Sequence, residues 1–403
     1  MLGVDKLSLG ALRANSAFWG VLSLILLYLL VARSLGARGG ALAASIATFS
    51  PFHLAYSQEL RPYILTIVWG LLGFIVIEQI PISVRARRPC AALIGIWVLE
   101  LYTHYWGLFV AISQMLYGWW KYRKFGWAWI FPGGLFMALG VFSLWLPVFR
   151  IHFHEIMARN FEIPHPTPDL LVKTLVAFTG VQFRFALSDF SWAVAPWIKA
   201  VTVTVYGVSL ILGLRQGSLA ARLWLGSGLV IPFLVSYWHP IYVWYRYPFI
   251  CYPAFVWLVT WGVLSVKRRW MRGIMIFILL ISGVATCRTY FTTWNKANPQ
   301  AVAEYVASLK TPRTVIIRPA YFSDLFAFYD LGPALPVIDE DKLDSSSGRA
   351  AYRRNDIVFV AFDVPEDPVG DALRAEYSVL SVRSFPSAIP LHGINVYQLR
   401  QKG

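Results

Sequence analysis

The chain has 403 residues, of which 57% are hydrophobic and only 14% are charged, and its net charge is +15. Soluble domains carry roughly 25% charged residues, so this composition excludes a soluble enzyme, and the high apolar content excludes intrinsic disorder. The three cysteines match no zinc or redox spacing. We therefore expect a multi-spanning membrane protein, with no nucleic-acid partner despite the positive charge.

Charged residues divide the chain into two parts. Residues 1–290 hold 24 Lys and Arg against 8 Asp and Glu, whereas residues 291–403 hold 12 against 13. All of the positive excess therefore belongs to the apolar part. This pattern predicts an all-α membrane domain over 1–290, followed by a small soluble α/β domain over 291–403.

The apolar part predicts about ten transmembrane helices, because a spanning helix needs about 20 mostly apolar residues. The segment 150–195 separates the sixth and seventh spans and is expected to be a long outer loop. The fourth span is short, which indicates a tilted or partial helix. The predicted spans are 15–33, 39–56, 62–80, 91–103, 105–120, 126–148, 196–214, 221–238, 247–266 and 270–290.

Basic residues gather in alternate loops, after the first, third, fifth, seventh and ninth spans, with no acidic residue among them. The positive-inside rule makes these loops cytoplasmic, and the opposite loops and the C-terminal domain extracytoplasmic. The absence of any Asn-x-Ser/Thr sequon favours a bacterial plasma (inner) membrane. The residues concerned are Arg33, Arg38, Arg85, Arg87, Arg88, Lys121, Arg123, Lys124, Arg215, Arg222, Lys267, Arg268, Arg269 and Arg272.

The C-terminal part has the pattern of a small α/β domain. Apolar residues at helical spacing predict a helix over 301–309, and short apolar runs predict strands. The charged stretch 339–350 is expected to be a loop. The predicted strands are 314–318, 356–362, 378–385 and 394–400, and two further helices are predicted at 322–329 and 367–377.

Three groups of polar residues fall at the predicted outer ends of the spans, where ionisable side chains are functional candidates. The first is Glu59 with Arg61, held at a helix start by Pro62. Glu59 can bind a divalent metal such as Mg²⁺ or Mn²⁺, and Arg61 can bind a phosphate oxygen with its planar fork. The alternative is a plain Glu59–Arg61 ion pair at the helix start.

The second group is Glu100 with His104, which share a helix face if the helix continues. His104 can bind metal, donate to a phosphate or shuttle a proton, and Glu100 can be the partner that fixes its tautomer. The alternative is a histidine in an aromatic belt at the membrane interface.

The third group is Arg246 among Tyr245, Tyr247 and other aromatic residues at an outer helix start. A guanidinium beside a helix N-terminus suits phosphate binding. The alternative is an interfacial arginine that reaches the lipid headgroups. The pattern His152-x-His154-Glu155 resembles a metal cluster only weakly, and a solvated loop is the better interpretation.

These motifs resemble those of the GT-C membrane glycosyltransferases, in the glycosyltransferase family 39-like group of protein O-mannosyltransferases and lipid A aminoarabinose transferases. The resemblance covers most of the chain. The most specific match is the run from Ser50 to Tyr63, which contains Tyr56-Ser-Gln-Glu59-x-Arg61. The other matching segments are Arg13 to Ala17, Tyr102 to Tyr105, Arg246 and Tyr247 with Pro253, and Trp294 with Ala303 to Val306.

The resemblance implies transfer of a sugar from a polyprenyl-phosphate donor to a protein, lipid or glycan acceptor on the outer face of the membrane, with inversion. Arg61 and Arg246 would bind the donor phosphate, and Glu59 and His104 would be catalytic. Glu59 would also be the residue to hold a divalent metal. Tyr56, Tyr63, Tyr245 and Tyr247 would line the path of the sugar or the lipid.

The N-terminus departs from the family pattern. The family's catalytic carboxylate lies in a first outer loop that precedes the start of this chain, and Asp5 is a poor match for it. The charge alternation also places the N-terminus outside, which a short outer tail or a preceding helix would explain. We favour an absent first helix and first outer loop. The alternative functions are then an inactive GT-C scaffold that binds polyprenyl phosphate or a partner, and a transporter.

Overall fold

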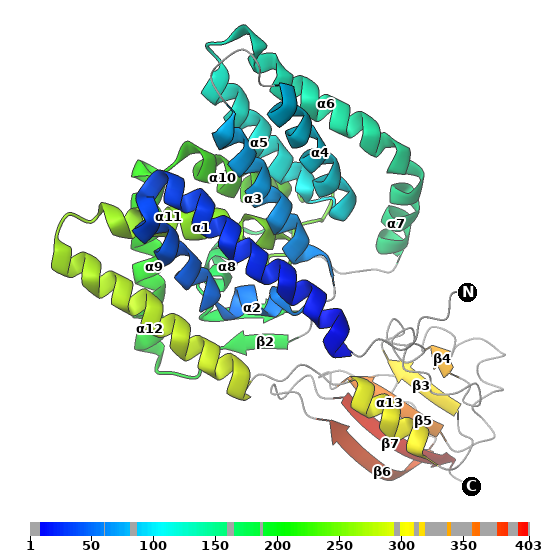
Figure 1. Cartoon of the computed structure of the whole chain (residues 1–403). Coiled ribbons are helices and arrows are strands. Elements are labelled where there is room, and N and C mark those ends of the chain that lie inside the picture. The colour runs from blue at the N-terminus through cyan, green and yellow to red at the C-terminus, as the bar shows by residue number, and fades with distance from the viewer. Residues whose placement is uncertain are drawn as a thin grey trace. The chain divides into compact units, whose positions relative to one another are not determined.

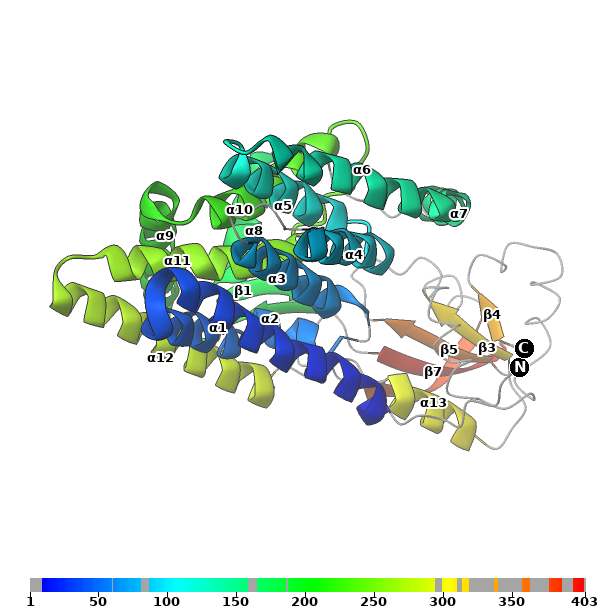
Figure 2. The ribbon, with the colours of Figure 1, turned by 45° about the horizontal axis from the view of Figure 1, so that its top comes forward.

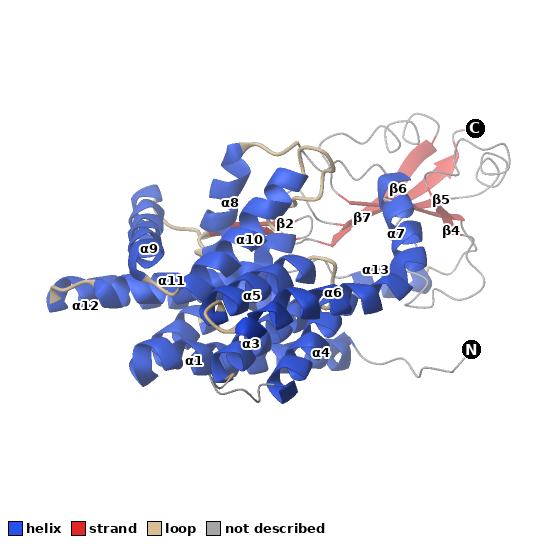
Figure 3. Cartoon of the chain, turned by 90° about the horizontal axis from the view of Figure 1, so that it is seen from above, coloured by secondary structure: helices blue, strands red, loops and turns tan. Residues whose placement is uncertain are grey.

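The computed structural model describes residues 9–59, 61–80, 87–158, 165–185, 188–293, 299–309, 314–318, 337–339, 357–362, 377–385 and 394–401. The chain divides into two compact units, of which the first holds residues 1–186 and 190–288 and the second holds the rest. Helices build the first unit apart from one short hairpin, whereas the second unit is built around a sheet (Figures 1 and 3).

The chain enters the first unit through α1 (Leu9–Thr48), a long helix with one break. Gly36 interrupts the helical geometry with φ +71°, a conformation that residues with a Cβ rarely adopt. This break falls between the first two predicted spans. A separate short helix, α2 (Pro51–Ser57), then starts at Ser50, whose hydroxyl accepts a hydrogen bond from the backbone N–H of His53.

Eight helices of the first unit pack in two rows. One row runs α1, α3 (Tyr63–Gln79), α4 (Arg87–Thr103) and α6 (Ile130–Phe142), and Figure 2 shows α1, α3 and α4 side by side. The other row runs α9 (Pro196–Gln216), α11 (Tyr252–Ser265), α10 (Leu219–Val235) and α5 (Gly107–Tyr122). The rows meet where α1 contacts α11 and where α5 contacts α3, α4 and α6.

Small residues allow α9 and α11 to approach closely. A Cβ added at Gly262 would lie 1.8 Å from the carbonyl oxygen of Ser209, and one added at Gly213 would lie 2.0 Å from that of Leu258. Such contacts are typical of membrane helices, whose association depends on close packing. The two glycines therefore set the distance between these helices.

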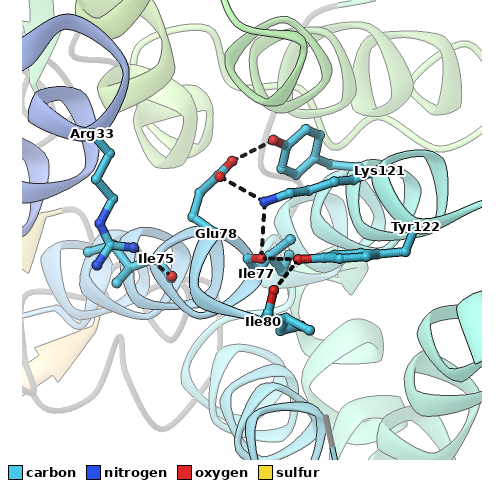
Figure 4. A network of polar contacts seen from close by, with 8 residues as sticks. Arg33, Ile75, Ile77, Glu78, Ile80, Lys121 and Tyr122 are labelled. Carbon is cyan, nitrogen blue, oxygen red and sulfur yellow. Dashed lines mark hydrogen bonds and ion pairs between the residues drawn. The ribbon is translucent and has the colours of Figure 1, made fainter. Parts of the chain in front are cut away.

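Polar contacts hold the two rows together at the helix ends shown in Figure 4. Lys121 pairs with Glu78 at 2.8 Å, and the hydroxyl of Tyr122 donates to the carbonyl oxygens of Ile77 and Ile80 at 3.0 and 2.8 Å. Arg33 donates to the carbonyl oxygen of Ile75 at 3.0 Å. The basic residues after the first and fifth predicted spans thus lie beside the end of the third, as the charge alternation requires.

Length and composition identify helices that can cross a membrane. Among the described residues, five are long and apolar enough: Arg13–Thr48, Gly126–Ile151, Pro196–Gln216, Tyr247–Ser265 and Arg269–Thr292. The shorter helices Tyr63–Gln79 and Leu219–Val235 are also apolar. The chain is a multi-pass membrane protein, and the number of ten crossings stays a prediction.

The segment 150–195 is more ordered than the expected loop. It contains the end of α7 (Leu146–Ala158), the helix α8 (Pro168–Phe178) and a hairpin of β1 (Gln182–Phe185) and β2 (Ser188–Ser191). Proline at the first position favours the start of α8, and an ion pair at 2.8 Å joins Asp169 to Lys173 one turn later. Amphipathic spacing over this helix was the signal that the loop interpretation missed.

The first unit continues through the short helix η3 (Tyr247–Cys251) into α11, and α12 (Arg269–Thr293) is the last transmembrane helix candidate. The remaining described segments lie in the second unit. They are α13 (Pro299–Ser308), β3 (Thr314–Arg318), β4 (Val337–Asp339), β5 (Ile357–Phe362), β6 (Tyr377–Phe385) and β7 (Ile394–Gln401).

The second unit is a mixed sheet in the order β4-β3-β5-β7-β6, in which β3 is parallel to β4 and β5, and β7 is antiparallel to β5 and β6. Its core includes Ile316, Phe359 and Leu399. Helix α13 contacts the sheet through Tyr305, whose hydroxyl accepts from Gln398 at 2.9 Å. The α/β prediction is confirmed, including its helix at 301–309 and its four strands.

Two details of this unit differ from the sequence prediction. The strand β4 was not expected, because three residues are too short for a periodic pattern. Tyr377 begins a strand rather than ending a helix. The helix predicted at 322–329, residues 367–376 of the helix predicted at 367–377, and the charged loop after Asp339 lie outside the described residues.

Candidate functional site

The candidate site lies where several helix ends of the first unit meet. Tyr63 begins α3, His104 lies in the turn between α4 and α5, and Tyr247 begins η3. These three residues are far apart in the sequence, yet their rings are neighbours. The structure thus brings together residues from all three groups that the sequence singled out.

Four rings form what we call the aromatic cluster: Tyr63, His104, Trp106 and Tyr247. The His104 ring centroid lies 5.3 Å from that of Tyr63 and 5.4 Å from that of Tyr247. Trp106 lies 5.3 Å from Tyr247 on the other side. Offset ring pairs at these separations are attractive, so the cluster is a packed surface.

Arg246 lies over this cluster. Its guanidinium carbon is 6.0 Å from the ring centroid of Tyr63 and 5.8 Å from that of Tyr247, within the range of a cation–π contact. Contact with two tyrosine rings restricts the guanidinium. A cation–π contact uses the charge and not the N–H groups, so these remain suited to bind an anionic ligand. Arg246 therefore lies over two of the rings that neighbour His104.

Arg61 approaches the same cluster from the start of α3. Its side chain is 53% exposed, and its charge acts on Tyr63 and Tyr247. The Nε of Arg61 lies 4.0 Å from a carboxylate oxygen of Glu59, at the outer limit of an ion pair. A contact of this length between partly exposed groups contributes little to stability.

Tyr56 is buried and contacts the backbone of Arg246. Only 1% of its surface is exposed, and its hydroxyl donates to the backbone carbonyl oxygens of Tyr245 and, at 3.2 Å, of Arg246. Its ring stacks on Phe249 at 3.9 Å. The hydroxyl of Tyr56 thus bonds to the backbone of the segment that carries Arg246, and its lining of a substrate path stays a prediction.

Two further contacts hold this segment. The hydroxyl of Ser236 accepts the backbone N–H groups of Ile241 and Tyr242 at 3.1 and 2.8 Å. On the other side, Thr174 of α8 donates to the carbonyl oxygen of Trp244 at 3.0 Å. The segment is therefore fixed at both ends, and α8, within the expected outer loop, contributes to the site.

Glu59 is the candidate carboxylate. Its side chain is 22% exposed, and its backbone carbonyl oxygen accepts a hydrogen bond from Ser16 of α1. Within the described residues, no group of three His, Cys, Asp or Glu side chains could hold a metal ion. Mg²⁺ is commonly bound by one or two carboxylates together with waters and substrate phosphates, so Glu59 would be the protein ligand of such a metal and the described residues add no second His, Cys, Asp or Glu cluster to it.

His104 has fixed surroundings. Its backbone N–H donates to the carbonyl oxygen of Glu100 at 3.0 Å, and the backbone N–H of Trp106 donates to the ring Nδ1 at 3.1 Å. Burial lowers the pKa of His104 to about 4, so the imidazole is neutral at pH 7.

Glu100 does not contact the His104 ring, contrary to the suggestion that it fixes the tautomer. Its side chain is fully buried, and Oε1 accepts from Gln114 at 3.2 Å. Gln114 also donates to the carbonyl oxygen of Gly70 at 2.9 Å, and accepts from Trp97. His104 follows the last residue of α4, Thr103, and its backbone N–H still makes the helical hydrogen bond to Glu100, but the two side chains have different partners.

The residues of the weak metal pattern lie elsewhere. His154 is exposed on α7, and the side chains of His152 and Glu155 lie outside the described residues. The expectation that these residues belong to a solvated loop is wrong in one respect, because the segment is helical.

Tyr245 contributes its carbonyl oxygen, as described, and its ring lies 5.4 Å from that of Trp244.

Sequence reasoning missed Trp106, Phe249 and Thr174. Trp106 and Phe249 occur in aromatic runs with no period that distinguishes them from membrane-facing residues. Their nearness to His104 and Arg246 in the sequence was the available signal. Thr174 gave no signal, because its partners are about 70 residues away in the sequence.

Comparison with solved structures identifies the fold. The chain aligns over 96% of its length with 83% of ArnT from Cupriavidus metallidurans in the apo state, with 13% identity and a TM-score of 0.51. The same ArnT bound to undecaprenyl phosphate gives a TM-score of 0.47 at 13% identity, covering 96% of this chain and 84% of ArnT.

An oligosaccharyltransferase from Archaeoglobus fulgidus, tethered with an acceptor peptide containing the NVT sequon, gives 0.49 at 10% identity. That alignment covers 98% of this chain and 63% of the oligosaccharyltransferase. No family model and no curated protein matches the sequence. On the likeness to apo ArnT, the chain has the fold of ArnT, which agrees with the resemblance to the GT-C group that the motifs indicated.

Proposed function

We propose that this protein transfers a glycosyl group from a polyprenyl-phosphate-linked sugar to an acceptor hydroxyl, with inversion at the anomeric carbon. One observation carries the proposal: Arg246 and Arg61 approach an aromatic cluster that also contains the neutral His104. Cations beside aromatic rings suit a ligand that combines a phosphate with a sugar and a lipid.

The reaction that fits this arrangement is a displacement. The acceptor oxygen forms a bond to the anomeric carbon, and the bond from that carbon to the phosphate oxygen breaks. The electron pair leaves with the polyprenyl phosphate, whose negative charge grows. Arg246 and Arg61 stabilise this charge, and positively charged donors fixed in advance are effective in this role.

The remaining site residues serve the acceptor and the sugar. The displacement releases the proton of the acceptor hydroxyl, and Glu59 is the carboxylate we assign to accept that proton or to orient the hydroxyl. Tyr63, Tyr247 and Tyr245 supply surfaces for the sugar or the lipid. A divalent metal at Glu59 would require ligands beyond the described residues, and the displacement is written without it.

The membrane determines where this reaction occurs. The lipid-linked donor reaches the site from the bilayer, and we place the site at the outer face of the plasma membrane because the basic loops occupy the opposite ends of the helices. The acceptor is a protein, lipid or glycan with a free hydroxyl. The second unit is then extracytoplasmic, where it can contact the acceptor.

A transfer assay in proteoliposomes tests the proposal, with radiolabelled polyprenyl-phosphate mannose and aminoarabinose as donors. Arg246→Ala should reduce kcat/KM about 100-fold or more, since removal of one group that stabilises a developing oxyanion costs about 10²–10³. Arg123→Ala is the matched control, because its guanidinium also stacks on an aromatic ring, 4.5 Å from that of Trp120, at the far end of α5. Equal activity of both variants would refute the site.

A further inference from the structure

His104 is held by its backbone and by the rings around it. Its backbone N–H donates to Glu100, and its carbonyl oxygen accepts the N–H of Gly107 at 2.8 Å. Tyr63 and Tyr247 flank the imidazole, with ring centroids 5.3 and 5.4 Å away. The ring therefore has a fixed position and a fixed orientation.

The hydrogen bond from Trp106 distinguishes the two ring nitrogens. The backbone N–H of Trp106 lies 3.1 Å from Nδ1 of His104, and a backbone amide is only a donor. Nδ1 must accept this bond, so it carries no proton. In a neutral imidazole the single proton is then on Nε2.

The other nitrogen, Nε2, forms no hydrogen bond with the residues that the structure describes. It is the nitrogen that can reach a ligand, and in this tautomer it offers an N–H group. A general base at the same place would need a bare Nε2 and a protonated Nδ1. The Nδ1–H would then face the Trp106 N–H, donor against donor, and the bond would be lost.

Burial keeps the His104 imidazole neutral, and two cations lie near the rings around it. Arg246 lies over Tyr63 and Tyr247, the same two rings that flank His104, and Arg61 acts on both tyrosines. A protonated His104 would add a third positive charge to this group. The nearest carboxyl along the helix, Glu100, accepts from Gln114 and does not offset it.

We propose that His104 acts in the transfer reaction as a neutral hydrogen-bond donor through Nε2–H, with an anionic phosphate oxygen of the donor as its acceptor, and that the Trp106 backbone N–H fixes this tautomer. The inference rests on the proposed function and assigns His104 to the phosphate end of the site. The acceptor proton must then go to another group, which separates the role of His104 from that of Glu59.

Three substitutions separate a donor from a base. His104→Gln places an amide N–H₂ near the position of Nε2, whereas the shorter His104→Asn reaches only the position of Nδ1, and His104→Ala removes both. A donor role predicts that His104→Gln keeps kcat/KM within about tenfold of the wild type, while His104→Asn and His104→Ala lose about 10²–10³. Equal loss in all three would overturn the proposal, because an amide cannot act as a base.

A second measurement does not depend on activity. Nitrogen-15 NMR of histidine-labelled protein in nanodiscs reports which ring nitrogen is protonated. We expect the His104 signals, assigned by their loss in His104→Gln, to show protonated Nε2 and bare Nδ1 at pH 7. Added farnesyl phosphate should shift the Nε2–H signal. Protonation at Nδ1, or at both nitrogens, would overturn the proposal.

The two measurements also separate this inference from the proposed function. If the wild type transfers no sugar while the NMR shows the Nε2–H tautomer and the farnesyl phosphate shift, the transfer reaction fails and the phosphate contact of His104 stands. If the wild type transfers sugar and His104→Gln behaves as His104→Ala does, the donor role fails and the transfer reaction stands.

Discussion

Tyr56→Phe removes one hydroxyl group from the contact that holds the backbone of Arg246. The hydroxyl donates to the carbonyl oxygens of Tyr245 and Arg246, and the side chain is 1% exposed, so no water replaces the lost donor without a rearrangement. The aromatic ring remains, and its stacking on Phe249 should be unchanged. The substitution therefore tests the hydrogen bond alone.

The structure allows an estimate of the effect. A buried hydrogen bond contributes about 0.5–1.5 kcal/mol, and leaving a buried partner unsatisfied costs about 1–3 kcal/mol. Ser236 and Thr174 still hold the rest of the segment, so the cost should lie near the lower end, at about 1–2 kcal/mol. If this cost falls on the placement of Arg246, kcat/KM decreases about 5- to 30-fold.

The assay is sugar transfer in proteoliposomes, with KM and kcat determined separately and the melting temperature measured in parallel. Tyr206→Phe is the control, because Tyr206 is 4% exposed on α9 and makes no hydrogen bond with a described residue. We expect Tyr56→Phe to lower kcat/KM while Tyr206→Phe leaves it unchanged. Unchanged kcat/KM in Tyr56→Phe would refute the positioning role, even if the melting temperature decreases.

Three further predictions concern stability and pH. Gly262→Ala should lower the melting temperature, because its Cβ would lie 1.8 Å from a carbonyl oxygen of α9. Gly207→Ala is the control, because open space surrounds Gly207, and equal melting temperatures of the two variants would contradict the close packing of α9 and α11. Glu78→Gln and Lys121→Gln should each cost about 1–3 kcal/mol, and a double-mutant cycle should show a coupling of about 1 kcal/mol; additive losses would exclude the pair. Because burial lowers the pKa of His104 to about 4 from 6.5, the unfolded chain takes up this proton first. Proton uptake at His104 therefore destabilises the folded protein as pH falls from 6.5 toward 4. The melting-temperature difference between wild type and His104→Gln should change over this pH range, and a difference that does not depend on pH would refute the buried, neutral His104.

The membrane helices could be predicted well because they depend on length and hydrophobicity, which the sequence shows directly. The charge alternation also required the ends of the first, third and fifth predicted spans to share one side, and Arg33 and Lys121 do lie beside the end of α3. The break at Gly36 matches the gap between two predicted spans. Segment 150–195 was predicted as a long outer loop, and the sequence reasoning did not resolve the helix α8 and the hairpin that it contains.

The candidate site could be predicted in its membership but not in its contacts. Glu59, Arg61, His104 and Arg246 stood out because charged and titratable residues are rare in this chain's apolar part. Which groups bond to one another depends on backbone positions that side-chain patterns do not show. The partner of the His104 ring is thus a backbone N–H rather than the carboxylate of Glu100, which accepts from Gln114.

The same limit applies to Tyr56. Its place in the motif predicted a residue that lines the substrate path, and it did not reveal that the hydroxyl donates to backbone carbonyl oxygens almost 190 residues away in the sequence. No local pattern encodes a contact at such a separation. The role that we infer for Tyr56 is to position Arg246.

The central claim is that the chain breaks the bond between a sugar and a lipid-linked phosphate. The most direct measurement uses a polyprenyl-phosphate sugar with tritium in the sugar and phosphorus-32 in the phosphate, supplied to the wild-type protein in proteoliposomes with membrane extract as the acceptor source. The account predicts that tritium moves to the acceptor while phosphorus-32 stays on the lipid, and that Arg246→Ala blocks this separation. Tritium and phosphorus-32 that remain together, whether on the lipid or on another molecule, would contradict it.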